Sequence, residues 1–362
     1  MKPRSLYIHI PFCAHLCSYC DFAKVLYEPK WAFSYVEKLI EEAQALPLTP
    51  VSTLYIGGGT PSVLDEKTLE GLLSFFAPYL LPGGEFTIEA NPENFTLEKA
   101  KLFRQYGVNR LSLGVESSQK RLLTLMGRHH DFADAQRAFS LAREVGFDNI
   151  SLDMIYALPD ETIGELNHDI DALLSFHSEH LSTYCLSVNP GTLFYNEKIP
   201  EMDQALAAEQ YETILRRFRA ASYERYEVSN FAQKGRQSRH NLTYWHDETY
   251  YGIGLGAAGY IEDIRYSNTR NLQRYLAGKY RAEEEQVSPE EDRKYFFLTN
   301  LRLAEGFSLE SYEKRFHERF EIRYQDTIKK LVASSLLILT PERVYPTDQG
   351  ILLLDRILLA LY

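Results

Sequence analysis

The sequence predicts an α/β fold: an open, curved partial barrel of six βα units, followed by a mainly helical C-terminal domain with a winged-helix-like layout. From the first residue to about position 230, short runs of β-branched and aromatic residues alternate with amphipathic helical patterns. Such alternation is typical of a parallel sheet built from βα units. Six units are too few to close an eight-stranded barrel. Beyond position 230 the alternation ends, and helical periodicity returns at Ser288.

The elements follow in chain order. The predicted strands are Leu6–Ile10, Thr53–Ile56, Glu85–Glu89, Arg110–Gly114, Asn149–Ile155 and Leu181–Val188. The predicted helices are Trp31–Ala45, Glu66–Phe76, Leu97–Tyr106, Phe132–Val145 and Ile163–Phe176. Thr96 and Asp131 each stand directly before a helix, where a side-chain oxygen can accept a hydrogen bond from a free backbone N–H group. We therefore expect both residues to be N-caps.

The chain is expected to divide into three segments. Residues 1–230 form the partial barrel, 231–287 a connecting region and 288–362 the C-terminal domain. The last segment contains a strand pair within LILTPERVYPT and ends in an apolar helix over Ile351–Leu361. Winged-helix domains often bind DNA, but acidic and basic residues are balanced from Ser308 to the end. This balance favours docking or dimerisation over DNA binding, and a homodimer is one expected assembly.

The composition restricts the class of protein. The net charge of −11 argues against broad nucleic-acid affinity, because neutralising phosphates requires clustered Lys and Arg. No run of about twenty apolar residues occurs, so no membrane span is expected. The N-terminus lacks the apolar stretch and cleavage site of a signal peptide. We expect a cytoplasmic protein.

Three of the four cysteines cluster at Cys13, Cys17 and Cys20. Thiolates at this CxxxCxxC spacing can bind three irons of a [4Fe–4S] cluster and leave the fourth iron open, whereas electron-transfer clusters normally take four cysteines. A structural zinc site is the alternative, with His9 or His15 completing a Cys₃His set.

The remaining cysteine, Cys185, lies in a predicted apolar strand. A buried free cysteine behaves as a small hydrophobic residue. We therefore expect Cys185 to be an inert core residue.

Unusual residues recur where the predicted strands end. The cysteine loop follows the first strand, GGGTP (Gly57 to Pro61) follows the second, Glu89 ends the third, Glu116 ends the fourth and Asp153 lies in the fifth. Ligand-contacting residues of parallel α/β folds gather at the carboxyl ends of the strands. We therefore expect these residues on one rim, where the glycines allow a ligand to approach the backbone closely.

Further polar and aromatic residues are candidates for this rim. Tyr7 and His9 share one face of the first strand, because strand side chains alternate, and Tyr19 lies between two of the cysteines. Arg128 is a candidate for polar contact with a cofactor, with a surface ion pair as the alternative. Asp153 is favoured over Arg128, because its apolar flanking residues make an unpaired carboxylate costly.

HNLTYW combines one imidazole, one amide and two large rings in His240, Asn241, Tyr244 and Trp245. An imidazole can ligate haem iron, and aromatic rings can stack on a macrocycle. The alternative for His240 is a half-buried histidine whose hydrogen bonds are satisfied.

Shortly after HNLTYW, Gly254, Gly256 and Gly259 match the pattern GxGxxG. A dinucleotide site would need a strand before this pattern and a helix after it. Here an aromatic-rich turn precedes it and a strand-like run follows. We interpret these glycines as positions of close packing or of close approach to a flat ligand.

CxxxCxxC, GGGTP, IEANPE, SLDMIYALP and EVSNFA…SRHNLTYW occur in this order, and together they resemble the oxygen-independent coproporphyrinogen III oxidase family of radical SAM proteins, in particular its haem chaperone branch. The resemblance covers nearly the whole chain. It implies a partial TIM-like barrel with an added C-terminal domain, a [4Fe–4S] cluster whose open iron chelates S-adenosylmethionine, and haem bound through HNLTYW. It places cofactor contacts at Tyr7, Gly58, Gly59, Thr60, Glu89, Arg128 and Asp153, with Tyr19 and Ser187 as looser matches.

Two features separate the branches of this family. The oxidase has a further cysteine two residues after the third ligand, where this chain has Phe22, and HNLTYW is the haem-binding signature of the chaperone branch. Glu116 departs from the family pattern GVQ, and its role as a cofactor contact is left open. The resemblance thus implies a chaperone that passes haem to apo-haemoproteins, with no catalytic residue assigned. The alternative is an oxidase that decarboxylates coproporphyrinogen III to protoporphyrinogen IX by radical chemistry.

Overall fold

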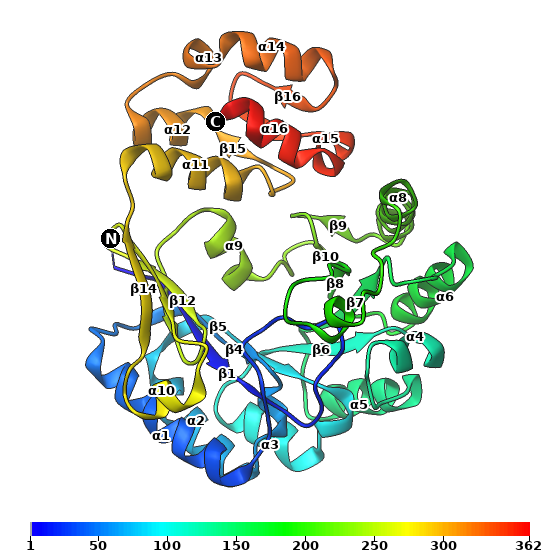
Figure 1. Cartoon of the computed structure of the whole chain (residues 1–362), viewed down its shortest axis with the longest axis vertical. Coiled ribbons are helices and arrows are strands. Elements are labelled where there is room, and N and C mark those ends of the chain that lie inside the picture. Colours follow the sequence, from blue (N-terminus) through cyan, green and yellow to red (C-terminus); the bar gives the residue numbers. More distant parts are fainter. Residues whose placement is uncertain (1) are drawn as a thin grey trace.

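The computed structural model describes residues 2–362, and its central element is a curved nine-stranded sheet (Figure 1). The sheet order is β11-β1-β4-β5-β6-β7-β8-β10-β9. Its strands are β1 (Ser5–Ile10), β4 (Val51–Gly58), β5 (Leu80–Ala90), β6 (Arg110–Glu116), β7 (Ile150–Tyr156), β8 (His180–Cys185), β9 (Glu224–Arg225), β10 (Asn230–Ala232) and β11 (Tyr251–Ile253). β1 and β4 to β8 pair in parallel, β11 extends the parallel sheet beside β1, and β9 and β10 are antiparallel. The six predicted strands are therefore confirmed.

Helices surround the barrel strands on their outer side (Figure 1). In chain order they are α1 (Pro29–Ala45), α2 (Glu66–Phe76), α3 (Leu97–Gln105), α4 (Lys120–Leu125), α5 (Phe132–Glu144), α6 (Ile163–Leu174) and α8 (Gln204–Ala220). The short helix α7 (Leu193–Asn196) instead lies against the cysteine loop, where the backbone N–H of Phe194 donates a hydrogen bond to the carbonyl of Ser18. Thr96 accepts a hydrogen bond from the backbone N–H of Lys99, and Asp131 forms a capping box with Asp134. Both predicted N-caps are confirmed.

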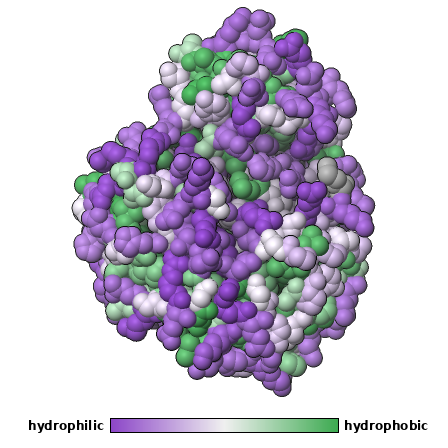
Figure 2. All heavy atoms as spheres, turned by 180° about the vertical axis from the view of Figure 1, so that it is seen from behind, coloured by the Kyte–Doolittle hydropathy of each residue, from purple (hydrophilic) through white to green (hydrophobic). Residues whose placement is uncertain are grey.

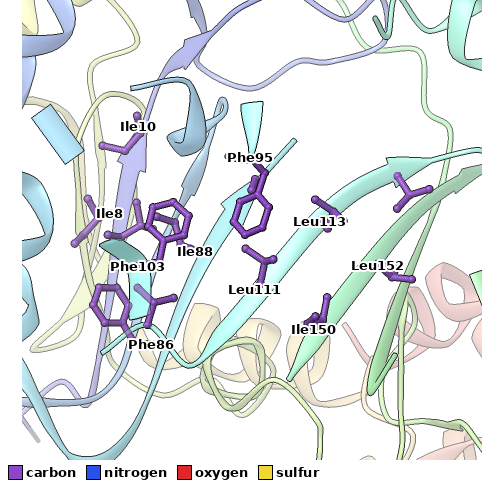
Figure 3. Close-up of a cluster of buried hydrophobic side chains, with 14 of the residues drawn as sticks. Ile8, Ile10, Phe86, Ile88, Phe95, Phe103, Leu111, Leu113, Ile150 and Leu152 are labelled. Atoms are coloured by element: carbon purple, nitrogen blue, oxygen red, sulfur yellow. The ribbon is translucent and has the colours of Figure 1, made fainter. Parts of the chain in front are cut away.

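Alternate residues of the parallel strands pack against these helices. Figure 3 shows this layer, with Ile8, Ile10, Phe86, Ile88, Leu111, Leu113, Ile150 and Leu152 among its buried side chains. Because strand side chains alternate, the intervening residues face the barrel interior. Thr87, Arg110 and Ser112 are such residues and are buried there. The barrel therefore has an apolar outer layer and a partly polar interior.

Residues between the barrel strands and the C-terminal domain form a second, smaller structure. It consists of α9 (Arg239–Trp245), α10 (Leu272–Leu276) and an antiparallel sheet of β12 (Ala258–Ile261), β13 (Ile264–Asn268) and β14 (Arg281–Gln286). A short parallel pair, β2 (Phe12–Cys13) and β3 (Val25–Leu26), holds the cysteine loop. In Figure 1, α9 lies between the barrel and the C-terminal helices.

The C-terminal part combines helices with a three-stranded antiparallel sheet. Its elements are α11 (Pro289–Asn300), β15 (Phe307–Ser308), α12 (Leu309–Phe316), α13 (Phe320–Arg323), α14 (Gln325–Ala333), β16 (Leu337–Leu339), β17 (Arg343–Pro346), α15 (Asp348–Leu352) and α16 (Leu354–Leu361). The strand order is β15-β17-β16. Its buried hydrophobic cluster, from Phe296 to Leu361, contains no buried barrel residue. The predicted fold class is thus confirmed.

The last predicted helix needs a correction. Instead of one helix over Ile351–Leu361, the chain forms α15 and α16, with a break at Leu353, whose φ of −117° and ψ of 30° are not helical. The first of them begins earlier because Thr347 caps it by accepting a hydrogen bond from the backbone N–H of Gly350. Apolar periodicity alone does not reveal such a break.

The surface is mostly polar. Figure 2 shows the side opposite to that of Figure 1 as predominantly hydrophilic, with hydrophobic residues in small scattered groups. Within residues 2–362, no helix is both long and apolar enough to span a membrane.

Candidate functional site

A pocket of about 350 Å³ opens at the carboxyl ends of the parallel strands. It is lined by all of the predicted cluster and cofactor residues except Tyr7, namely Cys13, Cys17, Tyr19, Cys20, Gly58, Gly59, Thr60, Glu89, Glu116, Arg128, Asp153 and Ser187. These residues come from six different strands or the loops after them. Strand order therefore brings together residues that are far apart in the sequence.

The three clustered thiols face this pocket from the loop after β1. The hydroxyl of Thr60 lies 3.8 Å from Cys13 Sγ, and Arg128 Nη1 lies 3.8 Å from Cys17 Sγ. In residues 2–362, no group of three or more His, Cys, Asp or Glu side chains is arranged to hold a single metal ion. An iron–sulfur cube does not need such convergence, because each thiolate binds a different iron. Three thiolates match the three irons of a cube whose fourth iron stays open.

Burial and a nearby lysine act in opposite directions on the pKa values of two of the thiols. Burial raises the pKa of Cys13 to about 12, and it raises the pKa of Cys20 as well, while the nearby charge of Lys24 acts in the opposite direction on both. Metal ligation requires thiolates, so the charge of bound iron has to offset this burial. The ammonium of Lys24 also donates a hydrogen bond to the backbone carbonyl of Cys20.

The glycines of GGGTP let β4 and the cysteine loop approach each other. Gly58 has a φ of +116°, and a Cβ there would lie 2.5 Å from the imidazole of His9. A Cβ on Gly59 would lie 2.8 Å from the carbonyl oxygen of Phe12. A larger residue at Gly58 would have to displace the His9 imidazole, and one at Gly59 would have to displace the backbone of the cysteine loop.

Glu89 is held in place at the end of β5. Tyr55 OH donates a hydrogen bond of 2.7 Å to Oε1, and the backbone N–H of Gly58 donates one of 2.9 Å to Oε2. Burial raises the pKa of Glu89 to about 7 despite these two bonds. A cationic ligand such as an ammonium group would favour the ionised form of this carboxylate.

Arg128 and Glu116 form a buried pair next to Glu89, at the end of the neighbouring strand β6. Arg128 Nη1 lies 3.8 Å from Glu116 Oε1, and Nη2 donates to the carbonyl of Gly114 at 2.7 Å and to Asn91 Oδ1 at 3.0 Å. Burial raises the pKa of Glu116, and the charge of Arg128 lowers it. Glu116 also has a φ of 65°, which is uncommon for a residue other than glycine.

Asp153 lies on the floor of the pocket. Its carboxylate accepts hydrogen bonds from Ser112 at 2.9 Å and from Ser151 at 3.3 Å. Burial nevertheless raises its pKa. Its neighbours Leu152 and Met154 are fully buried on the other face of β7. The carboxylate is therefore oriented by two hydroxyls and turned towards the pocket.

Tyr7 is the one predicted cofactor residue that does not line the pocket. Tyr7 shares the inner face of β1 with His9, as expected, but its hydroxyl bonds to His9 Nδ1 at 2.9 Å and it lies outside the pocket lining.

The expectation that Cys185 is an inert core residue is wrong. β8 ends at Cys185 instead of Val188, so this thiol is exposed and lines the pocket.

The sequence analysis missed several lining residues. Asn91 donates a hydrogen bond of 3.2 Å to Thr60 Oγ1 and accepts one from Arg128, so it joins two predicted residues. Its position directly after the predicted strand that ends in Glu89 could have indicated that Asn91 lies on the same rim. Lys24 and Tyr184 also line the pocket, and no spacing rule marks either of them.

HNLTYW forms α9, which lies at the amino ends of the strands, away from the cysteines. The N–H groups of Arg239 and His240 each donate a hydrogen bond of 3.0 Å to the Glu85 carboxylate at the start of the buried part of β5. His240 is 1% exposed. Its Nδ1 is bonded to Thr53 Oγ1 at 2.8 Å, and its Nε2 to Tyr244 OH at 2.7 Å. Burial lowers the pKa of His240 to about 3, so the imidazole is neutral.

Of the other residues of HNLTYW, Thr243 is buried and the remaining four are half-buried. Asn241 and Tyr244 are partly accessible, and Trp245 Nε1 is buried without a hydrogen-bond partner. The Tyr55 ring lies beside His240, with centroids 5.0 Å apart. The same tyrosine donates to Glu89, so one side chain contacts both ends of the barrel interior.

The carboxyl end of α9 is fastened to the C-terminal domain. Asp247 is buried and forms ion pairs with Arg265 of β13 and with Arg315 of α12, the latter at 2.7 Å. Arg315 also pairs with Asp292 of α11. The helix that carries His240 is thus tied to the barrel at one end and to the C-terminal domain at the other.

The glycines after α9 serve close packing, as interpreted from the sequence. Gly254 has a φ of +101°, and a Cβ there would lie 2.5 Å from the carbonyl oxygen of His9. A strand, β12, contains Gly259, so the helix needed for a dinucleotide site is absent at this point of the described chain.

Comparisons with known proteins agree with this arrangement. Residues 7–173 match the radical SAM superfamily, and residues 287–353 match the HemN C-terminal domain. The heme chaperone HemW of Lactococcus lactis subsp. lactis (strain IL1403) is 39% identical, over 96% of this chain and 94% of that protein. The heme chaperone HemW of Bacillus subtilis (strain 168) is 38% identical, over 97% of each. The structure of coproporphyrinogen III oxidase (HemN) from Escherichia coli, a radical SAM enzyme, has a TM-score of 0.86 at 22% identity, over 99% of this chain and 90% of that one, which shows a shared fold.

Proposed function

The chain belongs to the HemW family of heme chaperones, and on this basis we propose that it binds a [4Fe–4S] cluster, S-adenosylmethionine and haem, and transfers haem to apo-haemoproteins. The observation that carries the proposal is the HNLTYW signature on a helix of its own, α9. Phe22 supports it, because this ring is 62% exposed beside the pocket where the oxidase branch would have a further cysteine. We place this activity in the cytoplasm.

In this proposal Cys13, Cys17 and Cys20 bind the cluster. When bound, the cluster supplies an open iron for the amino and carboxyl groups of S-adenosylmethionine. Glu89 and the backbone of the adjacent glycines accept hydrogen bonds from the ammonium group, for which the Glu89 carboxylate is already oriented by Tyr55. Arg128 holds its guanidinium beside Cys17, with Nη1 at 3.8 Å from Sγ.

Haem binds at α9 in this proposal, with His240 as the iron ligand. Both nitrogens of His240 have partners in the structure, so the bond between Nε2 and Tyr244 has to break when iron binds. Tyr244 and Trp245 are half-buried and offer ring faces for a macrocycle. Residues 1–230 then carry the cluster, 231–287 carry the haem site, and 288–362 form a domain that packs against α9.

One observation favours a second function, the oxidative decarboxylation of coproporphyrinogen III. The carboxyl-end pocket assembles every predicted cluster residue and all but one of the predicted cofactor residues, which is more than haem binding alone requires. In that function an enzyme would have to cleave S-adenosylmethionine for each propionate side chain that it oxidises.

Purified protein with a reconstituted cluster separates the two functions. The chaperone assignment predicts stoichiometric haem binding, transfer of haem to an apo-haemoprotein, and no protoporphyrinogen IX from coproporphyrinogen III under anaerobic conditions. Anaerobic turnover to protoporphyrinogen IX would overturn it. A haem titration with and without the cluster tests whether the two sites are independent.

A further inference from the structure

A buried histidine lies inside the barrel, between the cofactor pocket and α9. His180 is the first residue of β8 and is fully buried. It pairs in register with Ser151 of β7, whose neighbours Ile150 and Leu152 belong to the apolar outer layer (Figure 3). Because strand side chains alternate, Ser151 faces the interior, and His180 faces it on the neighbouring strand. This histidine belongs neither to the cofactor contacts nor to HNLTYW.

Hydrogen bonds join His180 to the pocket on one side and to α9 on the other. Towards the pocket, Nδ1 lies 2.7 Å from Ser151 Oγ, and the Ser151 hydroxyl lies 3.3 Å from the Asp153 carboxylate. Towards α9, Nε2 lies 2.8 Å from the hydroxyl oxygen of Tyr226, which accepts a hydrogen bond of 3.3 Å from the backbone N–H of Ser238. Ser238 is the N-cap of α9. A continuous chain therefore runs from the floor of the pocket to the first turn of the helix that carries HNLTYW.

The direction of these bonds follows from counting hydrogens. The backbone N–H of Ser238 can only donate, so the Tyr226 oxygen accepts there. The Tyr226 hydroxyl is buried, and within residues 2–362 the acceptor bonded to it is Nε2 of His180. Nε2 is then unprotonated, and the hydrogen of the neutral ring lies on Nδ1. The opposite tautomer would leave the Tyr226 hydrogen without an acceptor in a buried place, which is costly.

At the pocket end, the chain finishes on Asp153. The imidazole of His180 is neutral, because burial lowers its pKa well below the usual range and the charge of Arg110 acts in the same direction. Its one hydrogen, on Nδ1, donates to Ser151 Oγ, so the Ser151 hydrogen is free for another acceptor. The Asp153 carboxylate and Ser182 Oγ, at 3.3 and 3.1 Å, are both within reach of it. The charged acceptor makes the stronger bond.

We propose that His180 is a positioning residue whose Nδ1–H tautomer turns the Ser151 hydroxyl towards Asp153 and links this carboxylate to the cap of α9. The inference rests on the proposed function, in which the pocket binds S-adenosylmethionine and α9 binds haem, and deepens it by naming the residue that couples the two sites. Tilting of α9 withdraws the Ser238 N–H from Tyr226. The Tyr226 oxygen is then free to accept from Nε2–H, and Ser151 turns from Asp153 to Nδ1. Opening of the haem site therefore loosens the cofactor site.

The tautomer is tested on the cofactor-free protein by nuclear magnetic resonance. The ring nitrogens of isotope-labelled histidine have different chemical shifts when protonated and unprotonated, and the signals of His180 are those lost in His180→Gln. We expect a protonated Nδ1 in wild type and a mixture of both tautomers in Tyr226→Phe, which lacks the donor to Nε2. A protonated Nε2 in wild type would overturn the inference. This measurement needs neither ligand, so it is independent of the proposed function.

Two amide variants separate the two bonds of His180. The side chain of His180→Asn reaches the position of Nδ1 and keeps the donor to Ser151, whereas that of His180→Gln reaches the position of Nε2 and keeps a bond to Tyr226. With a reconstituted cluster, affinity for S-adenosylmethionine should fall about 3- to 10-fold in His180→Gln and stay within about twofold of wild type in His180→Asn. A purely structural role gives the opposite order, because the shorter side chain leaves the larger cavity. His168→Gln is the matched control, since His168 is an exposed histidine of α6, and it should change nothing.

Haem titrations with and without S-adenosylmethionine measure the link to α9. In wild type, S-adenosylmethionine should weaken haem binding about fivefold, because haem binding opens α9 and coupling between two sites is reciprocal. In His180→Asn, which lacks the bond to Tyr226, the two haem affinities should be equal. Wild-type coupling in His180→Asn, or wild-type affinity of His180→Gln for S-adenosylmethionine, would overturn this inference alone. If wild type binds neither ligand, the proposed function fails and the inference fails with it.

Discussion

The two ends of the barrel are built in different ways. At the carboxyl ends of the strands, an open pocket of about 350 Å³ holds carboxyl groups whose pKa values burial has raised, including Glu89 and Asp153. At the amino ends, His240 is buried and both of its ring nitrogens have partners. The cofactor end is therefore already arranged for a charged ligand. The haem end has to open before its histidine can bind iron.

This difference bears on how each ligand binds. Binding to a preformed site costs little free energy of reorganisation. At a closed site, the apparent affinity is lower because only the small open fraction of the protein can bind the ligand. Four variants test whether the cofactor end is preformed and the haem end closed.

Cys17→Ser should abolish the cluster while haem binding persists. A serine hydroxyl is a much poorer iron ligand than a thiolate. Within residues 2–362, no hydrogen bond joins α9 to the cysteine loop. Visible absorbance after anaerobic reconstitution measures the cluster, and a haem titration measures the second site. Simultaneous loss of haem binding would show that the two ends are not separate sites.

His240→Ala should weaken haem binding by roughly 100-fold or more and leave cluster absorbance intact, since loss of even an outer-shell partner of a metal ligand commonly costs 10- to 100-fold. Tyr244→Phe is the matched variant. It frees Nε2 of His240 from its hydrogen bond and should tighten haem binding about fivefold, because less is lost when the site opens. Weaker binding by this variant would argue against a closed haem site.

Stability of the cofactor-free protein should fall as pH rises, because of Glu89. Its pKa is about 7 in the fold against 4.5 for the free side chain, so its contribution is complete below about pH 4.5 and lost as pH rises through 7. The loss is up to about 3 kcal/mol in the free energy of unfolding. Urea denaturation between pH 5.5 and 8 should show a smaller decline for Glu89→Gln, which does not titrate. Identical declines would show that Glu89 titrates normally.

Tyr55→Phe should reduce the effect that S-adenosylmethionine bound at one end of the barrel has on haem affinity at the other end. Its hydroxyl stabilises the Glu89 carboxylate while its ring contacts His240, so the change should reduce affinity for S-adenosylmethionine by about fivefold, or about 1 kcal/mol. Haem titrations with and without S-adenosylmethionine measure the coupling, which should shrink in the variant. Tyr251→Phe is the control, since the Tyr251 hydroxyl donates its hydrogen bond to the carbonyl of Pro47.

Much of the fold and of the cofactor pocket could be predicted from the sequence because both depend on local patterns. Strand and helix periodicity, the N-caps Thr96 and Asp131, and the rule that ligands gather at carboxyl ends are sufficient to bring the cysteine loop, GGGTP and Glu89 together. Each of these signals occupies a few neighbouring residues.

The remaining features depend on contacts between distant residues. Nothing near His240 in the sequence indicates that Thr53, 187 positions away, will bond to its imidazole. The burial of Arg110 in the barrel interior is visible only once the neighbouring strands are placed. Cys185 was misjudged because the end of β8 is set by packing and not by the apolar run.

Asp247 links α9 mechanically to the C-terminal domain. The helix is fastened to the barrel through Glu85 and to the C-terminal domain through Asp247 and Arg315. It cannot tilt to expose His240 without breaking one attachment or moving the domain that holds the other. A protein that pulls on the C-terminal domain therefore applies force directly to the helix that carries the imidazole. Force at the surface then reaches a buried residue through one short helix.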